Sequence, residues 1–517
     1  MKNRLAKVIE SFDREKRAGA VEFCGSPLLR PPKSGAADEA RNHLLRRFGR
    51  DPGVFLAGTS GDEPCYLGMP EGEDGNILVV GGNGSGKTSS IAIPTLATWN
   101  GAIFALDIKG ELGAAYTSLY QRGLKSRPAL IFNLSDPACL GFDPFGWLIE
   151  DGADNVISNV WDLVCCLLPN SSNDSQPFWV EAERGVLAAA LLYFFKRGLG
   201  FTEAICLTLE KSCSQLCAEI MENGDMEEKL FLGEVEEGRS EMFAGIDRGL
   251  RNRLILFAAD PVISHTLRGT REGAACFSWD DLDHYNFFLQ IPAEQIEEWS
   301  GVISLMCTQL IRHLERRADR FSPGGSKSPQ LLLLLDEFPR FGKMERLTAA
   351  MTTLRSKGVN FCLIIQSLAQ LEKNYGKEGA EIIMDNVQDT IFGGFAPNSR
   401  TAEVLSKALG SRTVLSGSVS QGKDNASKSL QMMERALLTP DELKSLPKGT
   451  FIVMKTGTHP MRTRLRLFLE WGITFGEAYE TPDCGRRPVY YADCRELERA
   501  IEARYGLRPA GQVRTGV

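Results

Sequence analysis

The sequence lacks the features that mark secreted, membrane-spanning and zinc-knuckle proteins. Its 13 cysteines form no CxxC pair and no cysteine–histidine knuckle, so we expect reduced thiols and a cytosolic protein. No stretch reaches the ~18–20 continuous apolar residues that span a bilayer. The longest candidate, Val186–Phe195, is followed by two basic residues, and the charged N-terminus contains no apolar signal-peptide core. We therefore expect that this polypeptide does not cross a membrane.

An excess of positive charge is also absent. The formal net charge is −7, so the surface as a whole does not attract phosphate, and a nucleic-acid role requires local basic patches. Two arginine sets fit such a patch, namely Arg248, Arg251 and Arg253, and Arg462, Arg464 and Arg466. Each set also fits an ordinary solvated face, and we favour that interpretation for both.

Strands alternate with helices in two separate parts of the chain, which predicts an α/β fold with a central, mainly parallel sheet. In the first part we expect strands at Asn76–Gly81, Ala102–Ile108 and Ala129–Asn133, with helices at Lys87–Trp99 and Glu111–Arg122. In the second part we expect strands at Asn286–Ile291, Leu331–Leu335, Asn360–Ile365, Thr390–Phe395 and Thr450–Met454. The stretch between these parts has helical spacing, so an all-α domain is predicted to interrupt one sheet domain.

The predicted domain organisation has five parts. They are a peripheral N-terminal segment (1–70), the first part of the P-loop domain (71–150), the all-α insertion (151–284), the second part of the P-loop domain (285–475) and a C-terminal tail (476–517). Within the first segment we expect a charged helix, a break at Ser26–Gly35, a basic helix and a loop. The polar stretch Ser411–Ser429 predicts a mobile loop.

The strongest local signal is a complete P-loop motif, GxxxxGK[ST], between a strand and a helix. It consists of Gly81, Gly82, Asn83, Gly84, Ser85, Gly86, Lys87 and Thr88. Glycines allow backbone N–H groups to surround phosphate, and the helix N-terminus adds a favourable field. Lys87 is predicted to contact the β- and γ-phosphates of ATP, and Thr88 to offer its hydroxyl to Mg²⁺.

An acidic pair at the end of a strand complements the P-loop. Five consecutive leucines, Leu331–Leu335, predict a strand buried on both faces, and Asp336 and Glu337 follow it directly. The pair also fits a simple helix cap, but together with a P-loop it predicts an ATPase. Asp336 is then expected to support Mg²⁺, and Glu337 to polarise the attacking water.

Two further polar residues end predicted strands, and each has two interpretations. Gln366 follows Asn360–Ile365 and fits either a γ-phosphate sensor, which we favour, or a helix cap. Asp107 ends the strand after the P-loop helix and fits a second-shell metal contact or a cap equally well.

The chain resembles the type IV secretion coupling proteins, the TraG-like conjugative DNA-transfer ATPases, from about Ile77 to Glu470. The matching stretches are, in order, GGNGSGKT, ALDIKGEL, FNLSDP, FDPF, QPFWVEAERGVLAAALLYF, LLLLLDEFPRFGKM, LRSKGVNFCLIIQSLAQLEKNYG and ERALLTPDELKSLP. The resemblance implies a RecA-like ATPase domain and a homo-hexameric ring related to the FtsK and HerA pumps. It also implies an arginine that acts on a neighbouring subunit's ATP; Arg355 is the candidate by motif, with Arg340 and Arg400 as alternatives.

The resemblance further implies partners and a location. Expected partners are single-stranded DNA bound to a relaxase and its relaxosome, and components of a type IV secretion channel. The implied function is to use ATP to move this DNA, or a protein substrate, into the channel. Many family members carry N-terminal transmembrane helices, which we do not find, so membrane contact is expected only through partners at the inner face of the cell membrane. Two other functions stay open: a cargo-receptor platform in which hydrolysis only gates the handover, and a chromosome-pumping ATPase.

Overall fold

The computed structural model describes residues 45–47, 52–58, 65–134, 136, 138–150, 152–169, 177–233, 240–320, 328–344, 346–421, 426–465 and 467–468. The elements within these ranges belong to one compact unit, Met1–Thr474. The predicted charged N-terminal helix, the break at Ser26–Gly35 and the tail 476–517 lie outside the described residues.

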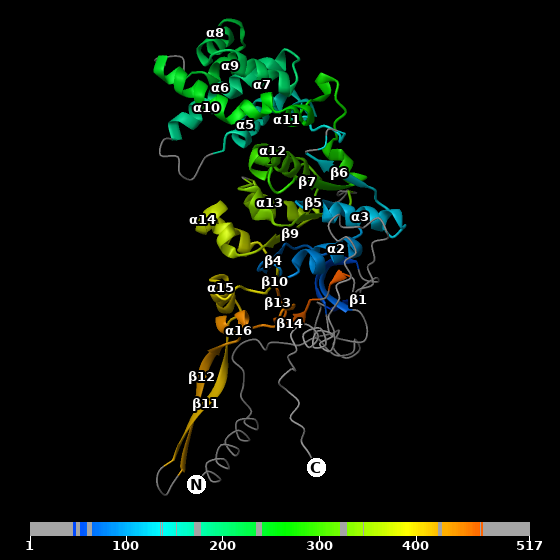
Figure 1. The fold of residues 1–517 in the computed structure, drawn as a ribbon, viewed down its shortest axis with the longest axis vertical. Coiled ribbons are helices and arrows are strands. Elements are labelled where there is room, and N and C mark those ends of the chain that lie inside the picture. The colour runs from blue at the N-terminus through cyan, green and yellow to red at the C-terminus, as the bar shows by residue number, and fades with distance from the viewer. Residues whose placement is uncertain are drawn as a thin grey trace, which may run out of the picture. The chain divides into compact units, whose positions relative to one another are not determined.

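A nine-stranded sheet forms the centre of the fold, in the order β14-β13-β10-β4-β9-β8-β5-β7-β6 (Figure 1). Its strands are β4 (Ile77–Gly81), β5 (Ala102–Asp107), β6 (Ala129–Asn133), β7 (Asn286–Gln290), β8 (Leu331–Leu335), β9 (Val359–Ile365), β10 (Asp389–Gly393), β13 (Thr450–Lys455) and β14 (Met461–Arg464). The strands from β10 to β6 run parallel, and β13 and β14 are antiparallel additions at one edge. The predicted α/β fold with a mainly parallel sheet is confirmed.

Continuous apolar runs explain why the central strands occupy the middle of the sheet. Every residue of β8 and β9 is buried, as expected for strands that are covered on both faces. The helices of this part are α2 (Ile93–Thr98), α3 (Glu111–Gln121), α12 (Ile296–Glu315), α13 (Leu347–Thr353), α14 (Leu368–Asp385), α15 (Thr401–Ala408) and α16 (Pro440–Lys444).

Along the chain, a helical region connects β6 to β7, as the sequence predicts. It contains α4 (Gly146–Glu150), α5 (Val156–Leu167), α6 (Pro177–Lys196), α7 (Phe201–Glu210), α8 (Cys213–Asn223), α9 (Met226–Phe231), α10 (Ser240–Ala259) and α11 (Pro261–Thr266). The apolar run Val186–Phe195 is the buried second half of α6, which explains its hydrophobicity as helix core. Among the described helices, none combines the length and apolarity that crossing a bilayer requires.

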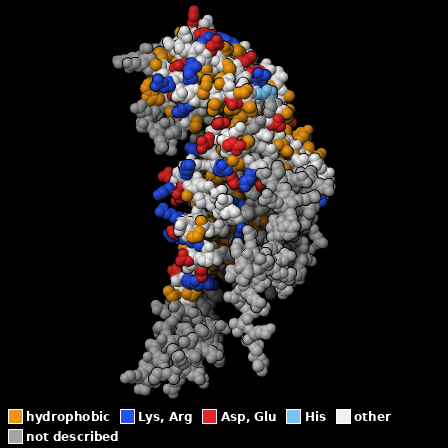
Figure 2. Space-filling view, viewed as in Figure 1, with side chains coloured by type: hydrophobic (Ala, Val, Ile, Leu, Met, Phe, Trp, Pro, Cys, Tyr) orange, Lys and Arg blue, Asp and Glu red, His pale blue; other side chains and the backbone are white. Residues whose placement is uncertain are grey.

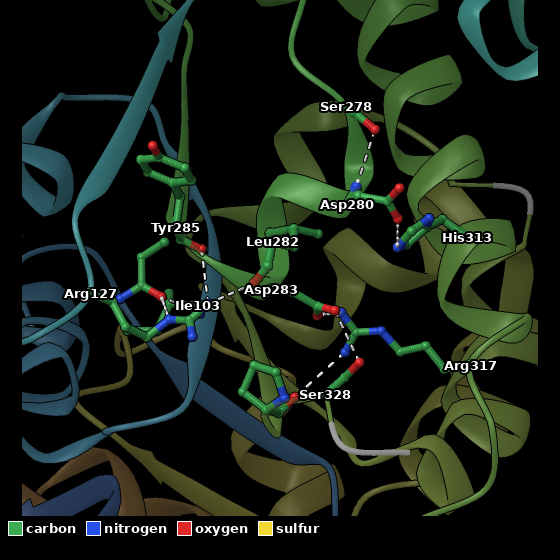
Figure 3. Close-up of polar contacts among 12 residues, drawn as sticks. Ile103, Arg127, Ser278, Asp280, Leu282, Asp283, Tyr285, His313, Arg317 and Ser328 are labelled. Carbon is green, nitrogen blue, oxygen red and sulfur yellow. Dashed lines mark hydrogen bonds and ion pairs between the residues drawn. The ribbon is translucent and has the colours of Figure 1, made fainter. Parts of the chain in front are cut away.

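A polar junction fastens the end of this helical region to the sheet (Figure 3). Arg317, on the segment after α12, donates to the Asp283 carboxylate at 3.0 Å, and Ser328 donates to the other oxygen of that carboxylate at 3.1 Å. From the sheet side, Arg127 donates to the carbonyl of Leu282 at 2.7 Å. Because buried guanidinium groups need such acceptors, these contacts hold the chain where it re-enters the sheet at β7.

The stretch before the P-loop domain differs from the predicted loop. Strands β1 (Leu45–Arg47), β3 (Cys65–Pro70) and β2 (Gly53–Gly58) form a small antiparallel sheet. All six residues of β2 are buried, and Thr95 of α2 accepts a hydrogen bond from the Phe55 backbone N–H at 3.0 Å. The loop prediction was wrong because the alternation in this segment is interrupted by glycine, and its burial comes from contacts distant in sequence.

The predicted loop at Ser411–Ser429 is a second correction. Strands β11 (Ser411–Gln421) and β12 (Ala426–Ala436) pair with each other as an antiparallel two-stranded ribbon (Figure 1). Serine and glycine normally indicate loops, yet a continuous hydrogen-bonded register from Ser411–Ala436 to Gln421–Ala426 satisfies the backbone here. Composition alone therefore misassigned this segment.

Candidate active site

The P-loop lies between the end of β4 and a short helical turn, as the motif requires. Gly84 and Gly86 have φ values of +69° and +87°, which glycine adopts without strain. The loop is also attached to the neighbouring strand, since the Gly82 N–H donates to the Gly394 carbonyl at 3.2 Å. The helix predicted from Lys87 begins instead as a π-helical turn, η1 (Thr88–Ala92), and continues as α2.

The Lys87 side chain is buried beneath the P-loop. Its ammonium donates to the carbonyls of Gly81 at 2.6 Å and Gly82 at 3.1 Å. Burial lowers the pKa of Lys87, while the nearby carboxylates of Asp336 and Glu337 act in the opposite direction. The ammonium thus lies within the phosphate-binding loop, where a phosphate oxygen can replace a backbone carbonyl as its acceptor.

The two predicted halves of the metal site meet in the structure. The Thr88 hydroxyl donates to the Asp336 carboxylate at 2.7 Å, although the two residues are 248 positions apart. Burial raises the pKa of Asp336, and the hydrogen bond from Thr88 opposes that rise. A hydroxyl and a carboxylate are the hard oxygen ligands that Mg²⁺ takes from proteins when phosphates and waters complete its shell. This donor set therefore fits Mg²⁺.

Glu337 occupies an unusual backbone position next to Asp336. Its φ of +50° and ψ of +29° place it in the left-handed region, which costs a non-glycine residue about 1–3 kcal/mol. The Glu337 N–H donates to the Asp336 carboxylate at 3.0 Å. One Glu337 carboxylate oxygen accepts a bond from Arg340, also at 3.0 Å.

A small cavity joins these residues to the end of β5. Its lining is Thr88, Asp107, Ile108, Lys109, Glu111, Asp336 and Glu337. Asp107 accepts a hydrogen bond from the Gly113 N–H at 2.8 Å, so it caps α3 while it also lines the cavity. Both interpretations of Asp107 are thus compatible with its position. Burial raises its pKa.

Gln366 lies at the same edge of the sheet. It follows Ile365, which pairs in register with Val80 next to the P-loop. The side chain is half-buried, and its backbone N–H donates to the Gln370 side chain at 3.0 Å. This position is compatible with the predicted sensor role, which stays a prediction.

Sequence reasoning assigned no role to Lys109, Glu111 or the contact between Arg340 and Glu337. The KGE run after β5 was a signal for the first two residues, because it directly follows a strand that ends at this edge. The Arg340 contact had no comparable signal, since a single arginine three residues after an acid is common.

The candidate trans arginine lies away from the P-loop of its own chain. Arg355 belongs to η6 (Leu354–Lys357), before the amino end of β9, whereas Gln366 follows the carboxyl end of that strand. Its side chain is 56% exposed and forms an ion pair with Asp74 at 3.6 Å. Arg400 is also exposed, at the start of α15.

The two arginine sets give little indication of a basic patch. In α10, Arg251 donates to the Leu209 carbonyl at 2.8 Å, and Arg253 pairs with Glu183 at 3.6 Å. In β14, Arg462 and Arg464 alternate with buried residues, as on a solvated strand face. Of the remaining two, Arg248 is exposed and Arg466 lies outside the described residues.

Comparison with known proteins shows which family shares this arrangement. The family model described as "Type IV secretory system Conjugative DNA transfer" matches residues 40–471. The chain belongs to this family. The protein VirD4 of Rhizobium radiobacter is 25% identical over 479 residues, which cover 90% of this chain and 64% of VirD4. The chain thus spans somewhat less than two thirds of that relative's length.

Solved structures with a similar fold include those of the plasmid coupling protein TrwB. The complex of TrwB with the ATP analogue ADPNP has a TM-score of 0.63 at 19% identity and covers 86% of this chain and 97% of TrwB. The complex of TrwB with ADP and Mg²⁺ has a TM-score of 0.62 at 19% identity, with the same coverage. This likeness shows that the chain shares its overall fold with these structures.

Proposed function

We propose that this member of the conjugative DNA transfer family is an ATP-hydrolysing coupling protein. It recruits a DNA substrate, a relaxase-bound single strand, or a protein substrate, and uses ATP to translocate it into a type IV secretion channel. The observation that carries the proposal is the contact of 2.7 Å between Thr88 and Asp336, because it joins the P-loop to the acidic strand end in one metal-binding geometry. The TrwB complexes with ADPNP and with ADP and Mg²⁺ support the same ligands.

Each residue at the edge of the sheet has a definite part in this proposal. The P-loop amides and Lys87 would hold the phosphates, and Thr88 and Asp336 would hold Mg²⁺, whose positive charge would offset that of the phosphates. Glu337 accepts a hydrogen bond from the attacking water and then takes the proton of that water as the reaction proceeds. Gln366 senses the γ-phosphate from the end of the neighbouring strand.

The proposal also places the protein in a homo-hexameric ring at the cytoplasmic face of the inner membrane, held there by channel components. Arg355 is exposed before the amino end of β9, away from the P-loop of its own chain. An arginine that acts on a neighbouring subunit's ATP must be exposed in this way. On the face shown in Figure 2, basic and acidic side chains are interspersed, so DNA contact is not proposed for that face.

The decisive experiment is steady-state ATP hydrolysis with and without single-stranded DNA, for the wild type and Glu337→Gln. We expect slow basal turnover that rises with DNA and with protein concentration. Glu337→Gln should still bind ATP but turn over at least ~100-fold more slowly, the scale of losing a positioned base. Hydrolysis that does not respond to DNA would favour the cargo-receptor alternative, and no hydrolysis under any condition would refute the motor.

A mixing experiment tests the role of Arg355. Arg355→Ala and Glu337→Gln should each be inactive alone, because one lacks the arginine and the other lacks the base. If Arg355 acts across the subunit interface, mixing the two variants places an intact arginine beside an intact base and partly restores hydrolysis. Mixtures that stay inactive would assign the arginine to another residue, with Arg400 next in line.

A further inference from the structure

The proposed base is already engaged by a residue of its own chain. Arg340 belongs to the short helix η5 (Phe338–Phe341), and its guanidinium donates to one Glu337 carboxylate oxygen at 3.0 Å. The Glu337 side chain is 20% exposed and that of Arg340 is 42% exposed, so the pair lies at the solvent side of the cavity. A guanidinium that pairs with one carboxylate oxygen occupies one of its acceptor sites and makes the carboxylate a weaker base toward the attacking water.

The loop that carries Arg340 packs against α12, β9 and α14, and α14 supplies side-chain hydrogen bonds to its backbone. Asn374 of α14 donates to the carbonyls of Pro339 at 2.7 Å and Gly342 at 3.3 Å, on either side of Arg340. The next residue, Tyr375, accepts a hydrogen bond from the Met344 N–H at 3.0 Å through its hydroxyl. These hydrogen bonds help to position the backbone of the loop from which the Arg340 side chain extends.

The same helix also contacts Gln366, the proposed sensor, which follows the carboxyl end of β9. The Gln370 side chain accepts a hydrogen bond from the Gln366 N–H at 3.0 Å. Gln370 and Asn374 are four residues apart in α14 and so lie on one face of the helix. Directly after Tyr375 the helix breaks at Gly376, where φ is +72° and ψ is 176°. Displacement of this first helical segment would therefore affect both Gln366, after the carboxyl end of β9, and the Arg340 loop.

We propose that Arg340 acts as a guard on Glu337, in the sense that their ion pair restrains the carboxylate. A shift of the first segment of α14 breaks this ion pair when Gln366 contacts the nucleotide. Arg340 is thus a positioning residue, and Asn374 and Tyr375 position it in turn. The inference rests on the proposed function, since a guard matters only if Glu337 is the base. In this arrangement the ion pair keeps turnover low until the γ-phosphate and the substrate are in place.

The test compares wild type, Arg340→Ala, Arg340→Lys and Tyr375→Phe in DNA-free hydrolysis, with KM and kcat measured separately. Exposed ion pairs contribute modestly, so Arg340→Ala should raise basal kcat by up to about fivefold while KM stays unchanged. Arg340→Lys should retain part of the restraint. Raising the salt concentration should increase the basal kcat of the wild type more than that of Arg340→Ala, because salt screens the exposed pair.

Coupling through α14 makes a separate quantitative prediction. Tyr375→Phe removes only the hydroxyl that holds the loop, and it should raise basal kcat less than Arg340→Ala does. The double variant Arg340→Ala/Tyr375→Phe should equal Arg340→Ala alone, because both changes act through one contact. Lys373→Ala removes an exposed charge from the same helix and serves as the matched control, with thermal melting to verify folding.

The outcomes separate this inference from the proposed function. If the wild type hydrolyses ATP and Arg340→Ala lowers kcat or leaves it unchanged, the guard is refuted and the proposed ATPase activity stands. If Tyr375→Phe and Arg340→Ala add independently, transmission through α14 is refuted. Absence of hydrolysis in the wild type under every condition would refute the motor, and the guard with it.

Discussion

Asp389 offers a sharp test of the energetics of this fold, because its carboxyl is completely buried without a hydrogen-bond partner. It is the first residue of β10, its side chain is 0% exposed, and neither oxygen has a partner among the described residues. Lys455 lies opposite it on β13, but that ammonium pairs with Glu73 at 3.1 Å. Burial raises the pKa of Asp389 from 3.8 to about 7; Lys455 opposes this rise and Glu73 adds to it.

The raised pKa makes stability depend on pH with a definite sign. Between pH 3.8 and about 7 the folded state keeps a proton on Asp389 that the unfolded state has lost. This contribution to stability is fully present below 3.8 and is lost as the pH rises through about 7. At about 1.36 kcal/mol per pH unit, an interval of about three units corresponds to a loss of about 4 kcal/mol.

The substitution Asp389→Asn removes the titration while it preserves size and polarity. Near pH 4 the variant should resemble the wild type, because both side chains are then neutral. By pH 8 the variant should be the more stable by up to about 4 kcal/mol, since the wild type then carries a buried charge. Urea unfolding followed at pH 4, 5, 6, 7 and 8 measures this difference directly.

The pH dependence of the stability difference between Asp389→Asn and wild type decides the outcome. Asp385→Asn, which removes an exposed carboxyl shortly before β10, is the control for a change in net charge. A stability difference between Asp389→Asn and wild type that stays constant from pH 4 to 8 would refute the reasoning. It would mean that Asp389 titrates alike in the folded and unfolded chain.

Two other predictions concern the P-loop and its support. Gly394→Ala should weaken nucleotide binding at least several-fold in a titration with a fluorescent ATP analogue, because a Cβ there lies 2.8 Å from the Ser85 Cβ and φ is +65°; unchanged affinity would show that the loop tolerates displacement. Asn360→Ala should lower the free energy of unfolding by about 1–3 kcal/mol in urea denaturation, since its buried amide donates to the Gly75 carbonyl at 2.8 Å and accepts from Gln330 at 2.6 Å; a loss under 0.5 kcal/mol, about the scale of a surface change, would contradict it.

Local signals in the chain were enough to locate the central strands and the helical insertion. Apolar runs such as Leu331–Leu335 have few alternatives to a buried strand, and the observed β8 has the same bounds. The P-loop motif likewise specifies its own backbone, since Gly84 and Gly86 are needed where φ is positive. These features depend on neighbours in sequence, which is why sequence reasoning reached them.

Segments with mixed composition were misjudged for the opposite reason. Glycine interrupts the strand-like pattern in the segment that contains β2. The burial of this strand depends on α2 and on strands far along the chain. The ribbon of β11 and β12 has the composition of a loop, and only pairing between its two halves makes it a strand pair. Strand propensity reflects such packing more than intrinsic preference.

For the site, the sequence by itself predicted which residues would carry chemistry, and the tertiary structure decided which of them meet. Thr88 and Asp336 come into contact because β8 and β9 insert between β4 and β5 in a parallel sheet, which brings all their carboxyl ends to one edge. The hydrogen bonds from α14 to the Arg340 loop and the burial of Asp389 without a partner among the described residues depend on the same non-local packing. Side-chain distances of this kind follow from the strand order, which a one-dimensional pattern does not contain.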